Sequence, residues 1–389
     1  MNPPPFQPRP RKNALPTYEE LSTEQDSILR LPANGRYLIK GAPGTGKTVM
    51  TLLRAASLRK RSKPVLYILH YKVLGRYCQQ LVKGPLDIQS YHSWFCRHFR
   101  ITYEQEVPEK SPFDYDWKAV EDICWKKNPE GPRKDSETHV IIDEGQDMPE
   151  GFYKYIDLHF DNILVAADEN QQISKEGSGV TFKDVIHSLN INESNVFELT
   201  RNYRNTREIA AFCQTFYTGA GGNPPEPPVR VGIKPLLVRH PGQERDRLAE
   251  LVCRRLHENP HQLVGFVPLR RKSVEEWQLR FLAHGVTPWI YNGDKRQLDR
   301  IDFSQGGVVL TNFHNIKGLE FDRLYVPDLR QYDCAADDVI CMNLYVLFSR
   351  PKDILIILEN MDEGADRIFP TVKREPTILT IKEYSNGTR

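Results

Sequence analysis

The residues in two short stretches of the sequence could bind and hydrolyse a nucleoside triphosphate. The first stretch, GAPGTGKT at residues 41–48, fits the pattern G-x-x-x-x-G-K-[ST]. Its glycines would let backbone N–H groups surround phosphate oxygens. An apolar strand before the stretch and a helix-permissive segment after it provide the setting that such a loop requires. The sequence therefore predicts a triphosphate-binding loop that uses Gly41, Gly44, Gly46, Lys47 and Thr48.

The second stretch, THVIIDEGQDMP at residues 138–149, places an apolar strand immediately before two adjacent carboxylates. Asp143 could hold a Mg²⁺ ion that Thr48 also ligates, and Glu144 could orient or deprotonate an attacking water. A kinase that transfers the phosphoryl group to a small molecule would not need the second carboxylate. The pair therefore predicts Mg²⁺-dependent hydrolysis.

Length and composition limit the other classes of function. A chain of 389 residues, 39% hydrophobic and 27% charged, predicts two domains with ordinary cores. It has no apolar run near 18 residues and no secretory signal, so we expect a cytoplasmic protein without membrane contact. Seven scattered cysteines lack metal-binding spacing and predict reduced thiols. The net charge of +2 predicts that a polyanion would be bound by local patches only.

Further motifs, together with these two stretches, resemble the UvrD/Rep/PcrA-like superfamily 1 helicases. DEGQD is similar to motif II of that family, D-E-[AF]-Q-D, while HNIKGLEFD and LYVLFSRPKD are similar to motifs V and VI. LSTEQ, VLYILHYKVL, QSYHSWF, ADENQQI and LTRNYRNTREI resemble the Q motif and motifs Ia, Ib, III and IV, in the family's order. The resemblance runs from about residue 21 to about residue 359. It implies a Mg²⁺–ATP-dependent helicase or translocase on single-stranded DNA, with 3′ to 5′ as the family's direction.

The resemblance also implies which residues hold ATP. Gln25 would read the adenine, and Tyr203 would stack on it. Glu320, which follows Gly318 in motif V, would accept a hydrogen bond from the ribose hydroxyl.

For catalysis, the resemblance adds residues far along the chain from the phosphate loop. Lys47 would meet the β- and γ-phosphates, and Arg204 and Arg350 would meet the γ-phosphate from a second domain. ATP would then act as a clamp between the domains. Gln171 would couple the γ-phosphate to the bound DNA strand. Because Gln172 follows it directly, the match of this glutamine to motif III stays open by one residue.

Motifs Ia, Ib and V face the nucleic acid in the family, and in this sequence they carry His70, Tyr71, His92, Trp94 and His314. Rings suit single strands because every base has a face on which a ring can stack. Trp94 could equally be a core aromatic of an amphipathic helix, whereas His92 is the favoured contact. Stacking and backbone contacts also leave RNA open as a substrate.

The predicted fold class is α/β, with two RecA-like domains, parallel sheets and minimal insertions. Residues 1–15 form a Pro-rich basic arm that we expect to be disordered. Residues 16–195 form the ATP-binding domain, with a small insertion at about 96–138, and residues 196–389 form the second domain. The relatives carry sizeable inserted domains in both halves, and this chain has room for neither.

A second departure lies after motif III, where the family's stacking sequence Y-R-W-R-G-A is replaced by ISKEGSG. This chain lacks both the stacking aromatics and the inserted domains. Their absence favours an alternative function more strongly than it would be favoured in a full-length relative. In that alternative, the chain is an ATP-controlled DNA-binding regulatory subunit that licenses a partner such as a nuclease, without processive unwinding.

Overall fold

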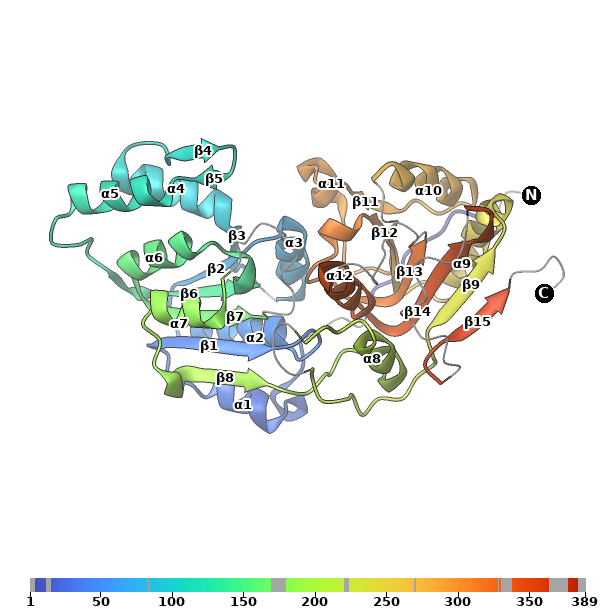
Figure 1. The fold of residues 1–389 in the computed structure, drawn as a ribbon, viewed down its shortest axis with the longest axis horizontal. Coiled ribbons are helices and arrows are strands. Elements are labelled where there is room, and N and C mark those ends of the chain that lie inside the picture. The colour runs from blue at the N-terminus through green and yellow to red at the C-terminus, as the bar shows by residue number, and fades with distance from the viewer. Residues whose placement is uncertain are drawn as a thin grey trace. The chain divides into compact units, whose positions relative to one another are not determined.

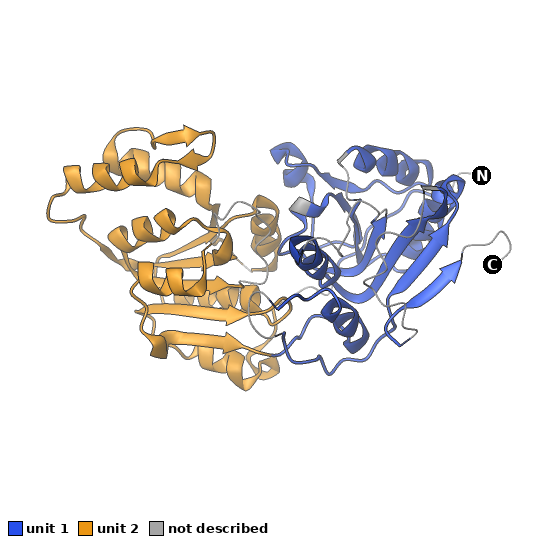
Figure 2. Ribbon diagram, in the orientation of Figure 1, with its two compact units in different colours: residues 1–13, 201–219, 223–389 blue, residues 14–200, 220–222 orange. Residues whose placement is uncertain are grey.

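The strands of the chain collect into two α/β units. The computed structural model describes residues 4–11, 15–82, 84–168, 180–219, 224–268, 271–327, 329, 338–363 and 377–383. The N-terminal unit comprises residues 14–200 and 220–222, and the C-terminal unit comprises residues 1–13, 201–219 and 223–389 (Figure 2). None of the described helices combines the length and the apolar character that a membrane span needs.

The N-terminal unit is built on a six-stranded sheet in the order β3-β2-β6-β7-β1-β8, in which every pair is parallel (Figure 1). Its strands are β1 (Arg36–Gly41), β2 (Val65–Leu69), β3 (Asp87–Ser90), β6 (Asp135–Asp143), β7 (Phe160–Ala167) and β8 (Val196–Leu199). The central strands are apolar runs because helices cover both faces of such a sheet. Leu38, Ile39 and Ile142 are accordingly buried completely.

The helices of this unit are α1 (Thr23–Leu29), α2 (Lys47–Lys60), α3 (Lys72–Leu81), α4 (Tyr91–Tyr103), α5 (Trp117–Lys127), α6 (Glu150–His159) and α7 (Phe182–Ser188). The predicted boundary between residues 195 and 196 falls just before β8. That strand belongs to the N-terminal unit because it pairs along β1.

The small insertion consists of the end of α4, a hairpin and α5. The hairpin strands are β4 (Glu109–Ser111) and β5 (Asp114–Tyr115), which pair in antiparallel fashion. The ring of Phe95 on α4 lies 5.0 Å from Tyr115 of the hairpin and 4.9 Å from Tyr155 of α6, measured between centroids. These aromatic residues belong to one core cluster that also includes sheet residues such as Ile142. The insertion therefore extends the core of the N-terminal unit and has no core of its own.

The C-terminal unit has a seven-stranded sheet in the order β11-β12-β10-β13-β14-β9-β15, again with every pair parallel. Its strands are β9 (Leu236–His240), β10 (Leu263–Phe266), β11 (Trp289–Tyr291), β12 (Gly307–Thr311), β13 (Phe321–Pro327), β14 (Pro351–Asn360) and β15 (Thr380–Glu383). Its helices are α8 (Arg207–Gln214), α9 (Arg245–Glu258), α10 (Arg271–Ala283), α11 (Lys295–Arg300) and α12 (Asp338–Phe348). The two parallel sheets confirm the predicted α/β class.

The first residues of the chain differ from the predicted disordered arm over residues 1–15. In the structure, residues 4–11 lie against the C-terminal unit. The backbone N–H of Phe6 donates to the carbonyl of Gly285 at 2.8 Å, and the Arg11 guanidinium lies 3.2 Å from the carboxylate of Asp322. The Arg11 side chain is only 4% exposed. A Pro-rich segment can be ordered in this way because an extended backbone can pair along an existing surface.

Candidate functional site

The glycine-rich loop joins the end of β1, Gly41, to the start of α2, Lys47. Gly44 and Gly46 have φ values of 85° and 93°, a region that residues with a β-carbon rarely adopt. At Gly41, an added β-carbon would lie 2.5 Å from the hydroxyl of Thr45. The loop therefore needs glycine at all three positions. It leads into the N-terminus of a helix, where unpaired N–H groups are suited to phosphate.

Lys47 lies inside this loop and is 7% exposed. Its ammonium donates to the carbonyl oxygens of Gly41 at 2.6 Å and Ala42 at 3.1 Å, and lies 3.5 Å from the carboxylate of Asp168. A buried ammonium needs such partners because an unpaired charge is costly to desolvate. A phosphate that entered the loop could replace the two carbonyl contacts.

Asp143, the last residue of β6, is fully buried beside the start of α2. Its carboxylate accepts a hydrogen bond at 2.9 Å from the hydroxyl of Tyr67 on β2, and the Thr48 hydroxyl lies near enough to lower its pKa. Burial and the neighbouring Glu144 raise the pKa of Asp143 to about 6, although Thr48, Tyr67 and Lys47 oppose the shift. The structure thus brings together the two residues that the sequence predicts as Mg²⁺ ligands. A hydroxyl and a carboxylate oxygen are ligand types that this cation prefers.

Glu144 adopts a left-handed backbone conformation with φ of 54° and is 4% exposed. The amide of Gln146 donates to its carboxylate at 2.6 Å, and the oxygen of the same amide accepts from the backbone N–H of Asp168 at 2.9 Å. Gln146 therefore connects the carboxylate after β6 to the end of β7. The sequence indicated Gln146 only as part of the motif DEGQD and did not indicate its role.

Gly145 stands where the resembled family usually has alanine or phenylalanine, and the surrounding packing explains the difference. An added β-carbon would lie 2.6 Å from both the Tyr153 hydroxyl and a methyl group of Val165. The same hydroxyl donates to the Gly145 carbonyl at 2.6 Å. Tyr153 on α6 therefore occupies the space that a side chain at residue 145 would need.

Gln25 contacts the loop from α1. It is 6% exposed, and its amide donates to the Thr45 carbonyl at 3.4 Å while its oxygen accepts from the backbone N–H of Ser22 at 3.2 Å. An added β-carbon at Gly46 would lie 2.8 Å from the Gln25 amide nitrogen. Gln25 therefore supports the loop, and its reading of adenine stays a prediction. Gln171 lies outside the described residues.

In the C-terminal unit, Glu320 and Arg204 form an ion pair although they lie 116 positions apart. The Glu320 carboxylate lies 2.8 Å from the Arg204 guanidinium and 3.3 Å from the ammonium of Lys352. Burial alone would raise the pKa of Glu320, but the two cations outweigh it and hold the pKa at about 2. Arg204 also donates to the Ser349 carbonyl at 3.3 Å. Arg204 of motif IV and Lys352 of motif VI therefore meet at the carboxylate of Glu320, which belongs to motif V.

Arg350 lies close to the same group of residues and is 1% exposed. Its Nε donates to the Val346 carbonyl at 2.9 Å. Burial raises the pKa of the Cys213 thiol, and the positive charges of Arg350 and Arg204 only partly oppose that shift. Both predicted arginines thus lie near one buried thiol of α8.

The other predicted nucleotide contacts in this unit lie in motifs IV and V. Tyr203 is 42% exposed, so its ring is accessible, and Gly318 has a φ of 77°, which favours glycine. The side chain of His314 lies outside the described part of the chain.

The predicted nucleic-acid contacts of the N-terminal unit follow the carboxyl ends of β2 and β3. His70 lies 4.6 Å from Tyr71, 5.4 Å from Tyr91 and 6.0 Å from His92, measured between ring centroids. Burial, together with the charges of His70 and Lys72, lowers the pKa of His92 to about 4. His92 is therefore uncharged at neutral pH and suits a base better than a phosphate.

Trp94 does not belong to this surface. It is 4% exposed, and its ring packs 4.7 Å from His98 and 5.9 Å from Phe160 within the core cluster. The prediction that Trp94 contacts nucleic acid is therefore replaced by the alternative of a core aromatic. A ring on the inner face of α4 is held there by the burial of its large apolar area.

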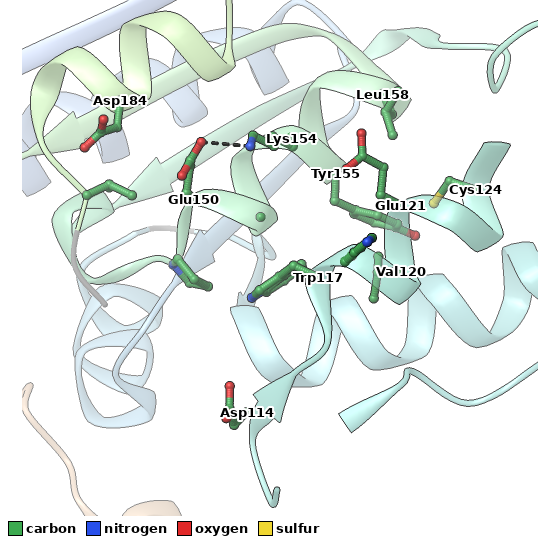
Figure 3. Close-up of a pocket in the computed structure, with 14 residues that line it drawn as sticks. Asp114, Trp117, Val120, Glu121, Cys124, Glu150, Lys154, Tyr155, Leu158 and Asp184 are labelled. Atoms are coloured by element: carbon green, nitrogen blue, oxygen red, sulfur yellow. Dashed lines mark ion pairs between the residues drawn. The ribbon is translucent and has the colours of Figure 1, made fainter. Parts of the chain in front are cut away.

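A cleft of about 610 Å³ lies beside α5 and α6 and is lined by none of the predicted site residues (Figure 3). Trp117 and Glu121 line its α5 side, and Glu150 and Lys154, which form an ion pair at 2.9 Å, line its α6 side. An added β-carbon at Gly151 would lie 2.2 Å from the Trp117 ring. This contact fixes the insertion against the helix that follows Asp143 and Glu144 in the chain.

Comparison with known proteins adds little to this geometry. No protein-family model matches the chain, and no curated protein matches it. One similar solved structure is the C-terminal domain of a possible DNA helicase from Lactobacillus plantarum WCFS1, with 17% sequence identity and a TM-score of 0.35. The match covers 46% of this chain and 98% of that domain. These values are too low to assign a family or an activity.

Proposed function

We propose that this protein is a Mg²⁺–ATP-dependent motor, a helicase or translocase, on single-stranded DNA, built from two RecA-like domains. The observation that carries this proposal is the closeness of the buried Asp143 carboxylate to Thr48 and Lys47 at the start of α2, where both residues lower its pKa. It joins a glycine loop that holds a buried lysine to the first of two adjacent carboxylates. This combination is suited to binding a triphosphate with its metal and hydrolysing it.

In this proposal, each residue of the loop has a separate task. Thr48 and Asp143 would hold Mg²⁺, which supplies positive charge that stabilises the phosphate oxygens. Lys47 would exchange the loop carbonyls for the β- and γ-phosphates. Glu144, held by Gln146, would orient the attacking water and accept its proton.

The C-terminal unit would contribute the residues that respond to the γ-phosphate. Arg204 and Arg350 would stabilise charge that develops on the transferred group, because a guanidinium stays charged and can bind two oxygens at once. Glu320 would contact the ribose and keep Arg204 in position. Tyr203 would stack on the adenine that Gln25 reads.

The strand would follow the carboxyl ends of β2 and β3, where His70, Tyr71 and His92 lie. An uncharged His92 and the neighbouring rings suit bases, each stacked base contributing about 1–3 kcal/mol elsewhere. DNA with 3′ to 5′ movement is the preferred substrate and direction, and RNA is the alternative substrate.

A second candidate function is supported by the insertion at residues 96–138. It shares its core with the N-terminal unit and so provides no separate domain that could act as a lever on a duplex. In this alternative, the protein is a regulatory subunit that uses ATP to load onto DNA and licenses a partner such as a nuclease.

One experiment separates the two functions. Stopped-flow fluorescence on end-labelled single strands of increasing length measures arrival at the end, while phosphate release measures hydrolysis. For a motor, the arrival time rises in proportion to length. Strand-stimulated hydrolysis without such a delay would favour the regulatory subunit, and a wild-type protein that binds neither DNA nor RNA would refute both functions.

A further inference from the structure

The tip of the hairpin in the insertion exposes a large aromatic side chain. Phe113 lies between β4 and β5 and is 69% exposed, while most aromatic residues around it are buried. No motif of the resembled family includes this residue. Its ring is nevertheless part of the surface on which the predicted nucleic-acid contacts lie, because it packs 5.3 Å from the His92 ring.

The backbone at Phe113 shows that the ring is kept at a conformational cost. Its φ is 68°, in the left-handed region that a β-carbon disfavours and that glycine tolerates. A turn of this kind would be more stable with glycine at that position. Because most of the ring is solvent-exposed, burial contributes little to offset this cost. Unfavourable backbone conformations of this type often mark functional sites.

Phe113 ends a continuous row of rings. From Phe113, the row passes to His92 at 5.3 Å, to His70 at 6.0 Å and to Tyr71 at 4.6 Å, measured between centroids. Its members come from the hairpin, the first turn of α4 and the segment between β2 and α3. The last three thus follow β2 and β3, at the carboxyl edge of a parallel sheet, where ligands of such sheets bind.

At the Phe113 end of the row, the charges favour bases over phosphates. Burial and the neighbouring His70 and Lys72 lower the pKa of His92 to about 4, so its ring carries no charge at neutral pH. The hairpin strands carry Glu109, Lys110 and Asp114, a mixture with no excess of positive charge. Lys72 offers a positive charge to a phosphate beside Tyr71, whereas at the Phe113 end of the row the face of a base could stack on an uncharged ring.

We propose that Phe113 stacks on a base of the single strand that passes along this row of rings. The inference rests on the proposed function, because it requires a strand to be bound at this edge of the sheet. It gives the insertion a direct role in strand binding and supplies an aromatic contact that the sequence after motif III lacks.

The test is fluorescence anisotropy with a labelled oligo-dT strand and, in parallel, an abasic strand of the same length. Phe113→Ala should weaken binding to oligo-dT by about 5-fold or more. This is the fold change expected at the lower end of the stacking energy of one base. The salt dependence should stay the same because no phosphate contact is lost. Binding to the abasic strand should not change, and Phe113→Trp should restore the affinity for oligo-dT.

Two further variants separate binding from folding. Ile101→Ala removes another apolar side chain of the insertion, one that is 72% exposed and lies outside the row, and should bind like the wild type. Phe113→Gly should lose affinity as Phe113→Ala does, yet unfold at the same temperature as the wild type or higher. A lower unfolding temperature for both Phe113 variants would assign the ring a structural role and overturn the inference.

Different results would refute the role of Phe113 and the proposed function. If the wild type binds oligo-dT and Phe113→Ala binds it equally well, the inference is wrong while the proposed function stands. If the wild type binds no single strand, the proposed function is wrong and the inference falls with it.

Discussion

Glu320→Gln should destabilise the C-terminal unit, and the loss should depend on pH. The carboxylate of Glu320 lies between two cations, 2.8 Å from Arg204 and 3.3 Å from Lys352. Burial alone would raise the pKa of Glu320, but these cations hold it at about 2, below the ordinary value of 4.5. Glutamine keeps the shape and one acceptor, yet it removes the charge and directs an amide N–H₂ towards one of the cations.

The magnitude follows from the difference in pKa between the folded and unfolded chains. A lowered pKa of an acid contributes stability that is complete above the unfolded value and is lost as the pH falls through the folded value. A pKa difference of about 2.5 corresponds to about 3 kcal/mol at neutral pH. Because the Glu320 side chain is 22% exposed, we expect a loss of about 1–3 kcal/mol.

The assay is urea unfolding of the wild type and Glu320→Gln at pH 7 and pH 3, with hydrogen exchange of β13 and β14 amides to locate the change in the C-terminal unit. The difference in the free energy of unfolding should shrink by about half or more at pH 3. Glu276→Gln, on the exposed face of α10, is the matched control and should change little. Equal stability of Glu320→Gln and the wild type at pH 7, or a difference that does not shrink in acid, would refute this reasoning.

The remaining predictions concern packing, charge and catalysis. Gly145→Ala should lower the free energy of unfolding of the N-terminal unit by about 1–3 kcal/mol, because its β-carbon would collide with Tyr153. Gly75→Ala is the control and should leave the free energy of unfolding unchanged, because the nearest side-chain atoms lie at an ordinary 3.5 Å. Similar melting temperatures for the two variants would contradict this prediction. Single-strand affinity should be constant from pH 6 to pH 8, because the lowered pKa of His92, about 4, leaves it uncharged there; a pronounced loss of affinity across that range would show otherwise. Arg204→Ala should lower ATP turnover by at least about tenfold with less effect on ATP binding, and a smaller loss would exclude it as an arginine finger.

The sequence could predict features that local patterns encode. Apolar runs followed by glycine or carboxylates indicated the strands and the loop between β1 and α2. The conformational need for glycine at Gly44 and Gly46, seen as positive φ, is the physical reason that the pattern is so specific. The proximity of Thr48 and Asp143 was predictable as well, because β1 and β6 are strands of one parallel sheet whose carboxyl ends share an edge.

Features that depend on distant contacts were not predictable. Trp94 lies on an amphipathic helix, and only the packing of α6 and β7 against it decides that its ring is buried. The contact between Arg11 and Asp322 joins residues 311 positions apart, so no local pattern could indicate that residues 4–11 are held by the C-terminal unit. Phe113 is a single aromatic in a turn, and its sequence context shows neither its exposure nor its positive φ.

The most direct test of the central claim is steady-state phosphate release by the wild type and Glu144→Gln, with and without Mg²⁺ and single-stranded DNA, alongside a direct measurement of ATP binding. We predict that wild-type turnover requires Mg²⁺ and rises with single strands. Glu144→Gln should still bind ATP, while its turnover falls by about 10²-fold or more because the group that accepts the proton from water is lost. Near-normal turnover in Glu144→Gln, or a wild type that neither binds nor hydrolyses ATP, would contradict the account.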